Sequence, residues 1–343
     1  MRHRIVRTAC LLAALCGGPV QAAAPAFQLT QRLELGGSGG WDYPSIEPSG
    51  HRLYLSRADH VAVVDLASGK EVATIPGTAG VHGIAFAPAL QRGWISSGKA
   101  DRVQVFDLAS DAVLATVPTG ANPDAILFEP DSAHVFAFNG RGHSATVIDA
   151  ISNQVLATIP LGGKPEFARA DGRGHVLVNI EDTGELVALD VRTNTVQSRW
   201  ALPRCEEPSG LAYDAAHHRA FSACGNQVLV VTDTDGGRSV ASVPIGKGVD
   251  GAEFDPATQE IFSANGEGSL TVIQEQTPDR YAVEQSLPTQ AGARTIALDP
   301  ASHALYLPTA GFGPTPAATA DVPRPRPPVL DGTFVVLVVR RPG

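Results

Sequence analysis

Apolar and polar residues alternate in short runs that recur along the chain at a nearly constant spacing. In one kind of run, residues such as Val61 and Val63 alternate with other residues before an acid, here Asp65. A period of two is typical of a β-strand. The acids that close these runs are separated by 42, 42, 41, 43 and 42 residues: Asp65, Asp107, Asp149, Asp190, Asp233 and Glu275. The spacing indicates an internal repeat of about forty residues.

A second kind of run in each repeat ends in proline. Its clearest copies are 71–76, 113–118 and 155–160, and successive closing prolines are separated by 42, 42, 43, 41 and 44 residues. Because proline has no N–H to donate, it is tolerated at the outer edge of a sheet. We therefore assign this run to the outermost strand of each repeat, and the run that closes on an acid to the strand inside it.

Each repeat also begins with an apolar strand that ends in a turn, and a second strand follows that turn. Seven such first strands occur, at 45–48, 84–88, 126–130, 167–171, 211–214, 252–256 and 296–300. Repeats of this length with four strands each are typical of propeller blades. The sequence therefore predicts an all-β fold, a seven-bladed β-propeller of four-stranded antiparallel blades.

The seventh repeat has no fourth strand after the strand expected at 333–339. The segment 27–35, which precedes two glycines, resembles the fourth strand of the third repeat. We therefore expect the N-terminal strand to pair in the last blade. Closing the ring in this way removes an exposed sheet edge.

The first 22 residues have the pattern of a secretory signal peptide. Three arginines precede a short apolar run, and small residues follow it up to Ala22. We expect cleavage after Ala22, which leaves 23–343 as a single β-propeller domain that is periplasmic or secreted. A lipoprotein anchor at Cys16 is the alternative, disfavoured by the leucine before it. No later stretch reaches the roughly 18 apolar residues of a membrane span, so none is expected.

The chain has a net charge of −9, and its part after the predicted cleavage site keeps 23 of the 26 basic and all 35 acidic residues, a net charge of −12. Net acidity disfavours binding to a phosphate backbone, although a local basic patch can act against it. No haem-attachment, phosphate-loop, His-Glu-x-x-His or paired-cysteine zinc motif occurs. The run 36–40 matches a hydrolase nucleophile motif in letters only, because it links two expected strands rather than a strand and a helix.

The repeat is similar to that of the YVTN-repeat β-propellers, the YncE-like family of exported bacterial proteins. The resemblance covers essentially the whole chain after residue 22 and rests on the Val-x-Val-x-Asp strand, the Ala-Thr-Ile-Pro strand and Gly-x-x-Pro turns such as 120–123 and 162–165. The second strands depart from the family's Tyr-Val-Thr-Asn pattern, and 135–139 and 261–265 come closest to it. The family implies a propeller fold. Its members are linked to ligand, nucleic-acid or metal-related roles, so it implies no single activity.

One residue per repeat is expected to begin the innermost strand and to face one mouth of the central channel. These residues are Asp42, His82, Asp124, Glu166, Ser209, Asp250 and Arg294. Two like charges about 4 Å apart repel by about 4 kcal/mol at a surface-like dielectric. Arg294, a bound cation, ordered water or raised pKa values could each compensate the acids. A divalent cation such as calcium suits carboxylate ligands, and its candidate ligands are Asp42, Asp124, Glu166 and Asp250. We expect His82 by itself to be a hydrogen-bonded structural residue.

The loops between second and third strands are expected to open at the same mouth. They add Asn139, Arg141, His143, Glu181, Asp182, Asn226, Asn265 and Glu267. Polar residues at such positions also satisfy backbone groups and channel water, which is the alternative for each of them. We take the mouth as the candidate ligand site.

An insertion with six prolines occupies 311–332, between the second and third strands of the seventh repeat. We expect it to emerge at the same mouth. A polyproline segment of this kind can form a semi-rigid lid, a docking strip for a partner, or simply a stiff surface loop.

Two cysteines remain after residue 22. Cys205 lies just before the first strand of the fifth repeat, and Cys224 ends its second strand. Antiparallel neighbours bring these two ends to the same side of one blade. In an oxidising compartment we expect a disulfide, with a thiol metal site as the alternative.

Three functions fit these features. The first is a non-catalytic periplasmic binding or scaffold propeller, which presents its acid-rich mouth to a small ligand, a metal ion or a partner protein. The second is a metal-assisted, lactonase-like hydrolase at the same mouth. The third, binding of single-stranded nucleic acid, is disfavoured because stacking aromatics and a basic groove are not evident. The sequence favours the first.

Overall fold

The computed structural model describes residues 26–319 and 325–342. The predicted signal peptide, residues 1–22, lies outside the described residues. Within the described part, no helix has the length and apolar character needed to cross a membrane.

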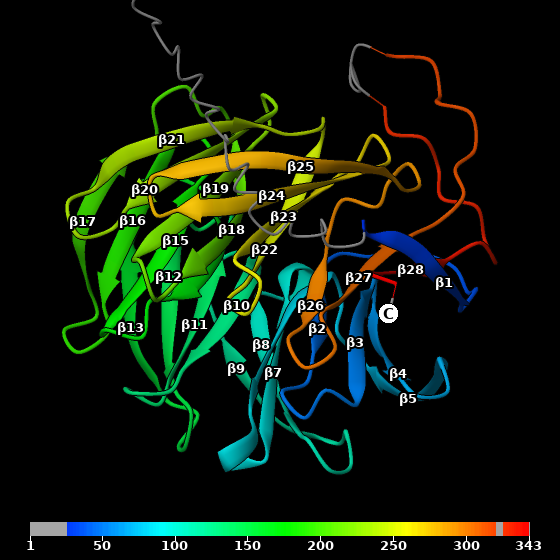
Figure 1. The fold of residues 1–343 in the computed structure, drawn as a ribbon. Coiled ribbons are helices and arrows are strands. Elements are labelled where there is room, and N and C mark those ends of the chain that lie inside the picture. The colour runs from blue at the N-terminus through cyan, green and yellow to red at the C-terminus, as the bar shows by residue number, and fades with distance from the viewer. Residues whose placement is uncertain (1–25, 320–324, 343) are drawn as a thin grey trace, which may run out of the picture.

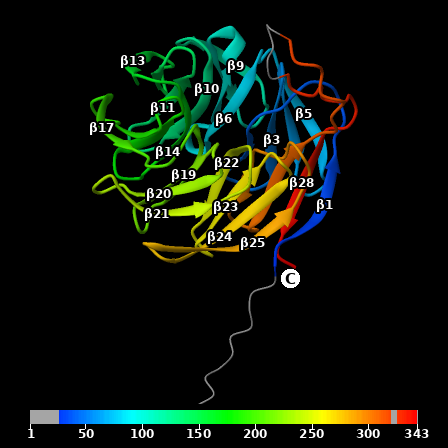
Figure 2. The same ribbon diagram turned by 90° about the horizontal axis from the view of Figure 1, so that it is seen from above.

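The chain folds into seven four-stranded antiparallel sheets arranged as blades around a centre (Figures 1 and 2). From the inner to the outer strand, blade one contains β2 (Pro44–Ile46), β3 (Arg52–Arg57), β4 (His60–Asp65) and β5 (Lys70–Pro76). Blade two contains β6 (Val81–Ala87), β7 (Arg92–Ser97), β8 (Arg102–Asp107) and β9 (Val113–Pro118), with short 3-10 turns at Pro88–Leu90 and Gly98–Ala100. Blade three contains β10 (Pro123–Glu129), β11 (His134–Asn139), β12 (Ser144–Asp149) and β13 (Val155–Pro160).

The remaining blades repeat this order. Blade four contains β14 (Pro165–Ala170), β15 (His175–Ile180), β16 (Glu185–Asp190) and β17 (Thr195–Ala201). Blade five contains β18 (Pro208–Asp214), β19 (Arg219–Cys224), β20 (Val228–Asp233) and β21 (Arg238–Pro244). Blade six contains β22 (Val249–Asp255), β23 (Glu260–Asn265), β24 (Ser269–Thr277) and β25 (Arg280–Pro288). Blade seven contains β26 (Ala297–Asp299), β27 (Ala304–Thr309), β28 (Val335–Arg340) and β1 (Gln28–Glu34). The predicted fold class is confirmed.

The N-terminal strand completes the last blade, as the sequence predicts. β1 pairs antiparallel with β28, from Gln28 opposite Arg340 to Glu34 opposite Val335, and the two strands lie side by side in Figures 1 and 2. Leu33 is buried with Val336 of β28. The outer edge of the blade therefore comes from the start of the chain and the rest of it from the end.

In five blades, the aspartate that closes the third strand stabilises the turn that follows it, which gives the repeat a local physical cause. Oδ1 of Asp65 accepts hydrogen bonds from the backbone N–H and the hydroxyl of Ser68, at 2.7 and 2.6 Å. Aspartates at the same position of the next four blades also accept turn N–H groups: Asp107, Asp149, Asp190 and Asp233. Glu275 is the equivalent residue of blade six, where β24 continues to Thr277. Its carboxylate accepts no hydrogen bond from the described N–H groups of the turn that follows.

The cores lie between neighbouring blades, where alternate residues of the strands interlock. Phe136 and Val147 of blade three, for example, share one buried cluster with Val178 and Val187 of blade four. Near the centre the first strands approach so closely that glycine is required. A Cβ atom on Gly210 would lie 2.7 Å from the amide nitrogen of Ala252 on the next blade. This packing fixes the spacing of the residues that begin the first strands.

The predicted disulfide is present between Cys205 and Cys224. It ties the segment before β18 to the end of β19, both on the side where first strands begin. The pairing of the two cysteines excludes the alternative of a thiol metal site at this position.

Candidate functional site

The structure brings together the residues that precede or begin the first strands. Charge interactions connect Asp42 with Asp124, Asp250 and Arg294, which come from four different blades. Glu166 interacts in the same way with Asp124 and Asp250. We call this set of residues the channel mouth: Asp42, His82, Asp124, Glu166, Ser209, Asp250 and Arg294.

His82 lies between two carboxylates of the mouth. Its Nδ1 is 2.5 Å from Oδ2 of Asp42 and 3.6 Å from Oδ1 of Asp124. Burial lowers the pKa of His82, but the hydrogen bond to Asp42 and the charge of Asp124 outweigh burial and raise the pKa to about 9. Burial raises the pKa of Asp124, and the charge of His82 opposes that rise. His82 therefore keeps its positive charge at neutral pH, between the two acids.

These three residues are the part of the mouth that is arranged like a metal-binding group. One ligand-type atom from each of Asp42, His82 and Asp124 lies within 4.8 Å of the others. Oδ1 of Asp124 is buried, and no hydrogen-bond donor among the described residues reaches it. Two carboxylate oxygens and one imidazole nitrogen could hold a divalent cation here.

The other two predicted metal ligands each have a basic partner. Oδ2 of Asp250 accepts a hydrogen bond from Nε of Arg294 at 2.7 Å, and Glu166 lies 2.6 Å from Nζ of Lys164. Burial, followed by the charge of Asp42, raises the pKa of Asp250 against the effect of Arg294. Burial and the charge of Asp124 likewise raise the pKa of Glu166 against the effect of Lys164. Repulsion among the acids is thus met by His82, Arg294 and Lys164.

Lys164 is a residue of the mouth that sequence reasoning missed. Its ammonium group contacts both Glu166 and Glu181. The signal was present, because Lys164 stands two residues before Glu166, and alternate residues of an extended chain point to the same side. Glu181 is therefore drawn into the mouth by Lys164.

Tyr43 and Phe167 contact each other beside the carboxylates of the mouth. Their rings meet edge to face with centroids 4.9 Å apart. Burial and the charges of Asp250 and Asp124 hold the pKa of Tyr43 well above its usual value, which places its hydroxyl near the mouth's carboxylates. The same two rings line a second cavity of about 230 Å³, together with residues further along the first strands, such as Ile84. Aromatic side chains therefore lie next to the charged residues of the mouth.

A cavity of about 890 Å³ opens over blades four to seven at the mouth. Its charged lining has both signs: Glu166, Glu181, Glu207, Asp250, Lys247, Arg294 and Arg326. Trp41 and Phe312 add aromatic surface, with ring centroids 6.0 Å apart. The cavity is large enough for a small organic molecule.

The proline-rich insertion forms part of the wall of this cavity. Its two ends pair as a short ribbon, in which Phe312 faces Val329 and the N–H of Gly313 donates to the carbonyl of Pro328 at 2.9 Å. Phe312, Thr315, Arg326 and Val329 all line the cavity. The described part of the insertion thus lies beside the mouth rather than away from it.

Several of the predicted loop residues serve their own blades. Asn139 and Asn265 are completely buried. The side-chain amide of Asn139 donates to Ser144 and Thr146 on the adjacent strand, and Asn265 makes the equivalent bonds in blade six. Arg141 is exposed after β11 and does not line the cavity. Further loop residues hold turns or lie at the surface: His143, Asp182, Asn226 and Glu267.

No protein family and no curated protein matches this chain. Among solved structures, a chain of the hydrazine synthase of Kuenenia stuttgartiensis is similar, with a TM-score of 0.67 and 16% sequence identity. The match covers 86% of the present chain and 96% of that chain. At this identity the likeness shows the propeller fold alone.

Proposed function

We propose that the protein is a non-catalytic binding propeller that takes a small polar molecule into the cavity at the channel mouth. The observation that carries this proposal is that the cavity lining contains both acids, such as Glu181, and basic residues, such as Arg326. A lining with both signs and two aromatic rings suits a ligand that carries both positive and negative groups on a small carbon frame.

Native mass spectrometry tests this proposal on protein purified from the cells that produce it. We expect a small molecule to be bound stoichiometrically to the natural protein. It should be lost from the double variant Glu181→Ala and Arg326→Ala, which removes two charged side chains of the cavity lining. Glu267→Ala, at a mouth loop outside the cavity lining, is the matched control and should keep the ligand. Absence of any bound molecule from the natural protein, or its retention in the double variant, would contradict the proposal.

A metal-assisted, lactonase-like hydrolase is the second candidate, supported by the unpartnered oxygen of Asp124 beside Asp42 and His82. A divalent cation held there would lower the pKa of a bound water, and a carboxylate of raised pKa is suited to accept its proton. Lactone hydrolysis should then require added metal and disappear in Asp124→Asn. Turnover that persists in Asp124→Asn, or none with any divalent metal, would remove this candidate.

We also propose that the chain is an exported, divergent YVTN-repeat propeller. The support is the seven-bladed ring, the recurring Val-x-Val-x-Asp strand and a disulfide, which persists in oxidising compartments. Cell fractionation and N-terminal sequencing of the purified protein test the proposed export. We expect the protein in the periplasm or the medium, beginning at Ala23, and a cytoplasmic protein with its N-terminus uncut would contradict export.

A further inference from the structure

A second group of ligand-type side chains lies at the opposite end of the blades from the mouth. Asp214 ends β18, whose second residue is at the mouth, and His217 follows in the turn to β19. Glu275 joins them from β24 of the next blade. Nδ1 of His217 lies 2.6 Å from Oδ2 of Asp214 and 3.0 Å from Oε1 of Glu275.

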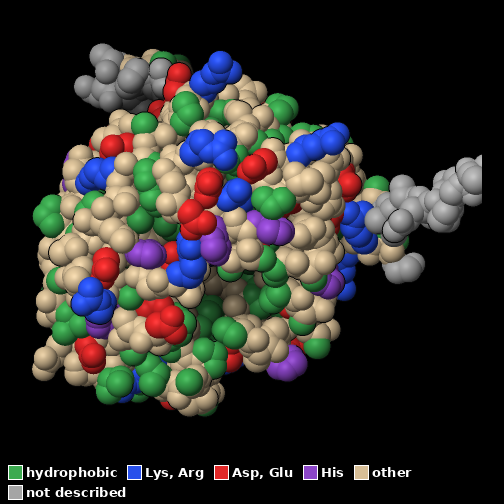
Figure 3. All heavy atoms as spheres, turned by 60° about the vertical axis from the view of Figure 1, so that its left-hand side comes forward, with side chains coloured by type: hydrophobic (Ala, Val, Ile, Leu, Met, Phe, Trp, Pro, Cys, Tyr) green, Lys and Arg blue, Asp and Glu red, His purple; other side chains and the backbone are tan. Residues whose placement is uncertain are grey.

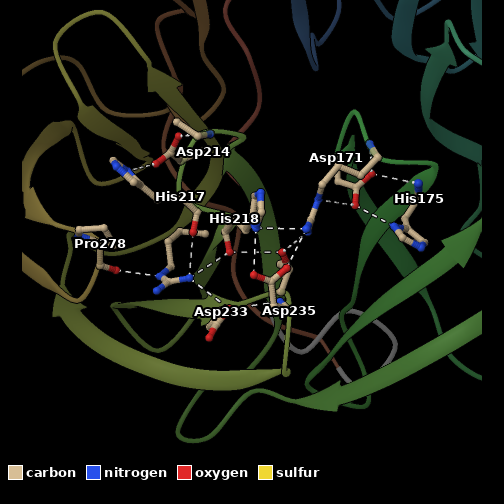
Figure 4. Close-up of polar contacts among 12 residues, drawn as sticks. Asp171, His175, Asp214, His217, His218, Asp233, Asp235 and Pro278 are labelled. Atoms are coloured by element: carbon tan, nitrogen blue, oxygen red, sulfur yellow. Dashed lines mark hydrogen bonds and ion pairs between the residues drawn. The ribbon is translucent and has the colours of Figure 1, made fainter.

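Pairs of aspartate and histidine recur at this end of the molecule. Nδ1 of His175 lies 2.8 Å from Asp171, and Nδ1 of His303 lies 2.6 Å from Asp255. Figure 4 shows the pair of Asp171 with His175 and the pair of Asp214 with His217 on neighbouring blades. Histidine, acidic and basic side chains are also frequent around the hollow of the face drawn in Figure 3. Among the described residues, a third ligand-type side chain joins the pair only at His217.

Glu275 differs from the residues that occupy its position in other blades. Asp65 and its four aspartate equivalents bind the N–H groups of the following turn. Glu275 is one methylene longer and points between blades five and six, where its side chain is 1% exposed. Neither of its oxygens accepts a hydrogen bond of suitable geometry from the described residues, although Nδ1 of His217 lies 3.0 Å from Oε1. The hydrogen that Nδ1 of His217 can carry is directed to Asp214 instead.

A buried carboxylate without a hydrogen bond is unfavourable unless a charge compensates it. Burial and the charge of Asp214 raise the pKa of Glu275. The charge of Arg219 opposes this rise, but its guanidinium is bound to Asp233, Asp279 and the carbonyl of Pro278. Two buried acids and one partly exposed imidazole thus converge on a point where only His217 and the already engaged Arg219 offset the negative charge.

We propose that Asp214, His217 and Glu275 bind a divalent transition metal ion, for which Zn²⁺ is the best fit. Imidazole nitrogens and carboxylate oxygens are both zinc ligands, and water can take the remaining position of a site with three protein ligands. The imidazole nitrogen disfavours calcium and magnesium, which prefer oxygen ligands. Because the ligands come from blades five and six, the ion links two adjacent blades. The site is separate from the mouth and does not depend on the function proposed there.

Calorimetric titration of the metal-stripped full chain with ZnCl₂ tests the site. Wild type should bind Zn²⁺, and Glu275→Gln, which keeps the shape of the side chain, should weaken that binding at least about tenfold. Zn²⁺ should raise the unfolding temperature of wild type and not that of Glu275→Gln. Binding of Co²⁺ should give a visible absorption spectrum that is lost in the same variant. His217→Gln, at a side chain that is 32% exposed, serves in place of Glu275→Gln if the buried change prevents folding.

Two variants act as matched controls. His303→Gln removes a histidine from a pair that lacks the third side chain, and His82→Gln removes the histidine of the mouth. Both variants should bind Zn²⁺ as tightly as wild type, and Zn²⁺ should raise their unfolding temperatures as it does that of wild type. Absence of Zn²⁺ and Co²⁺ binding in wild type would overturn the proposal. Zinc binding that is unchanged in both Glu275→Gln and His217→Gln would also overturn it. Zinc binding that is lost only in His82→Gln would place the metal at the mouth and overturn the proposed site.

Discussion

His82 and Asp42 join two neighbouring blades at the mouth, with Nδ1 of the imidazole 2.5 Å from Oδ2 of the carboxylate. The contact holds the proton of His82 to a pKa of about 9. In the unfolded chain a histidine loses this proton near its ordinary value of about 6.5. Folding and protonation of His82 are therefore linked.

We predict that this linkage makes stability fall as pH rises between about 6.5 and about 9. In that window the folded state keeps a proton that the unfolded state has lost, so the contribution of His82 is complete below the window and disappears above it. The slope is at most about 1.4 kcal/mol per pH unit. Urea unfolding of wild type and His82→Gln at pH 6, 7.5 and 9 measures it. The difference between the two proteins should shrink with pH, and a constant difference would contradict the prediction.

Glu166→Gln should stabilise the protein, and by more at pH 8 than at pH 5. Burial raises the pKa of Glu166, so the folded state holds a proton that the unfolded chain releases above its ordinary pKa of about 4.5. Stability of wild type is therefore lost as pH rises above that value, and a neutral amide removes the dependence. Lys164 keeps Glu181 as a partner in the variant. Unfolding curves at both pH values test this prediction, with a change at the exposed Glu267, Glu267→Gln, as the control. Destabilisation by Glu166→Gln at pH 8 would contradict the prediction and show that Lys164 keeps Glu166 ionised.

Replacing both Cys205 and Cys224 by alanine should lower the free energy of unfolding by about 3 kcal/mol. The disulfide joins residues 19 apart, and its main effect is to restrict the unfolded chain. Denaturant unfolding of wild type and the double variant provides the measurement. Wild type treated with a reductant should approach the variant, and equal stability of all three samples would show that the bond contributes little.

Leu33→Ala should destabilise the protein by about 3 kcal/mol, because Leu33 is 5% exposed and packs against β28. Leu29→Ala in the same strand is the control, since Leu29 is 39% exposed and its loss should change stability by less than about 0.5 kcal/mol. Deletion of 27–35 should destabilise the whole ring. Thermal unfolding of the three variants measures these effects. An unfolding temperature that the deletion leaves unchanged would show that β1 does not stabilise the ring.

The features that the sequence predicted correctly have local causes. Asp65 marks the end of a strand because its own carboxylate binds the turn at Ser68, so the chemistry of the repeat is visible in its spacing. The pairing of Cys205 with Cys224 follows from strand order alone. The closing strand at 27–35 was recognisable because it resembles the outer strand of another blade.

The features that were missed depend on how side chains meet between blades. Tyr43 reaches Phe167 across the channel, and Lys164 reaches two acids at once. The contact of Tyr43 with Phe167 has no signal in a single repeat, whereas the spacing of Lys164 and Glu166 within one repeat was visible and was not used. Asn139 was predicted at the mouth, but its amide donates to Thr146 of its own blade. Its position at the end of a strand does not determine in which direction the amide points. Glu275 could be noticed in the sequence as the one glutamate among six repeat acids, but its burial could not.

The pairing of Gln28 with Arg340 has a consequence for how the ring is made. Contacts between residues so distant in the chain are slow to form, because the loop that joins them must be closed first. β1 leaves the ribosome before the other strands of blade seven, so it stays unpaired until β28 has been synthesised. Blade seven is therefore the last blade to be assembled.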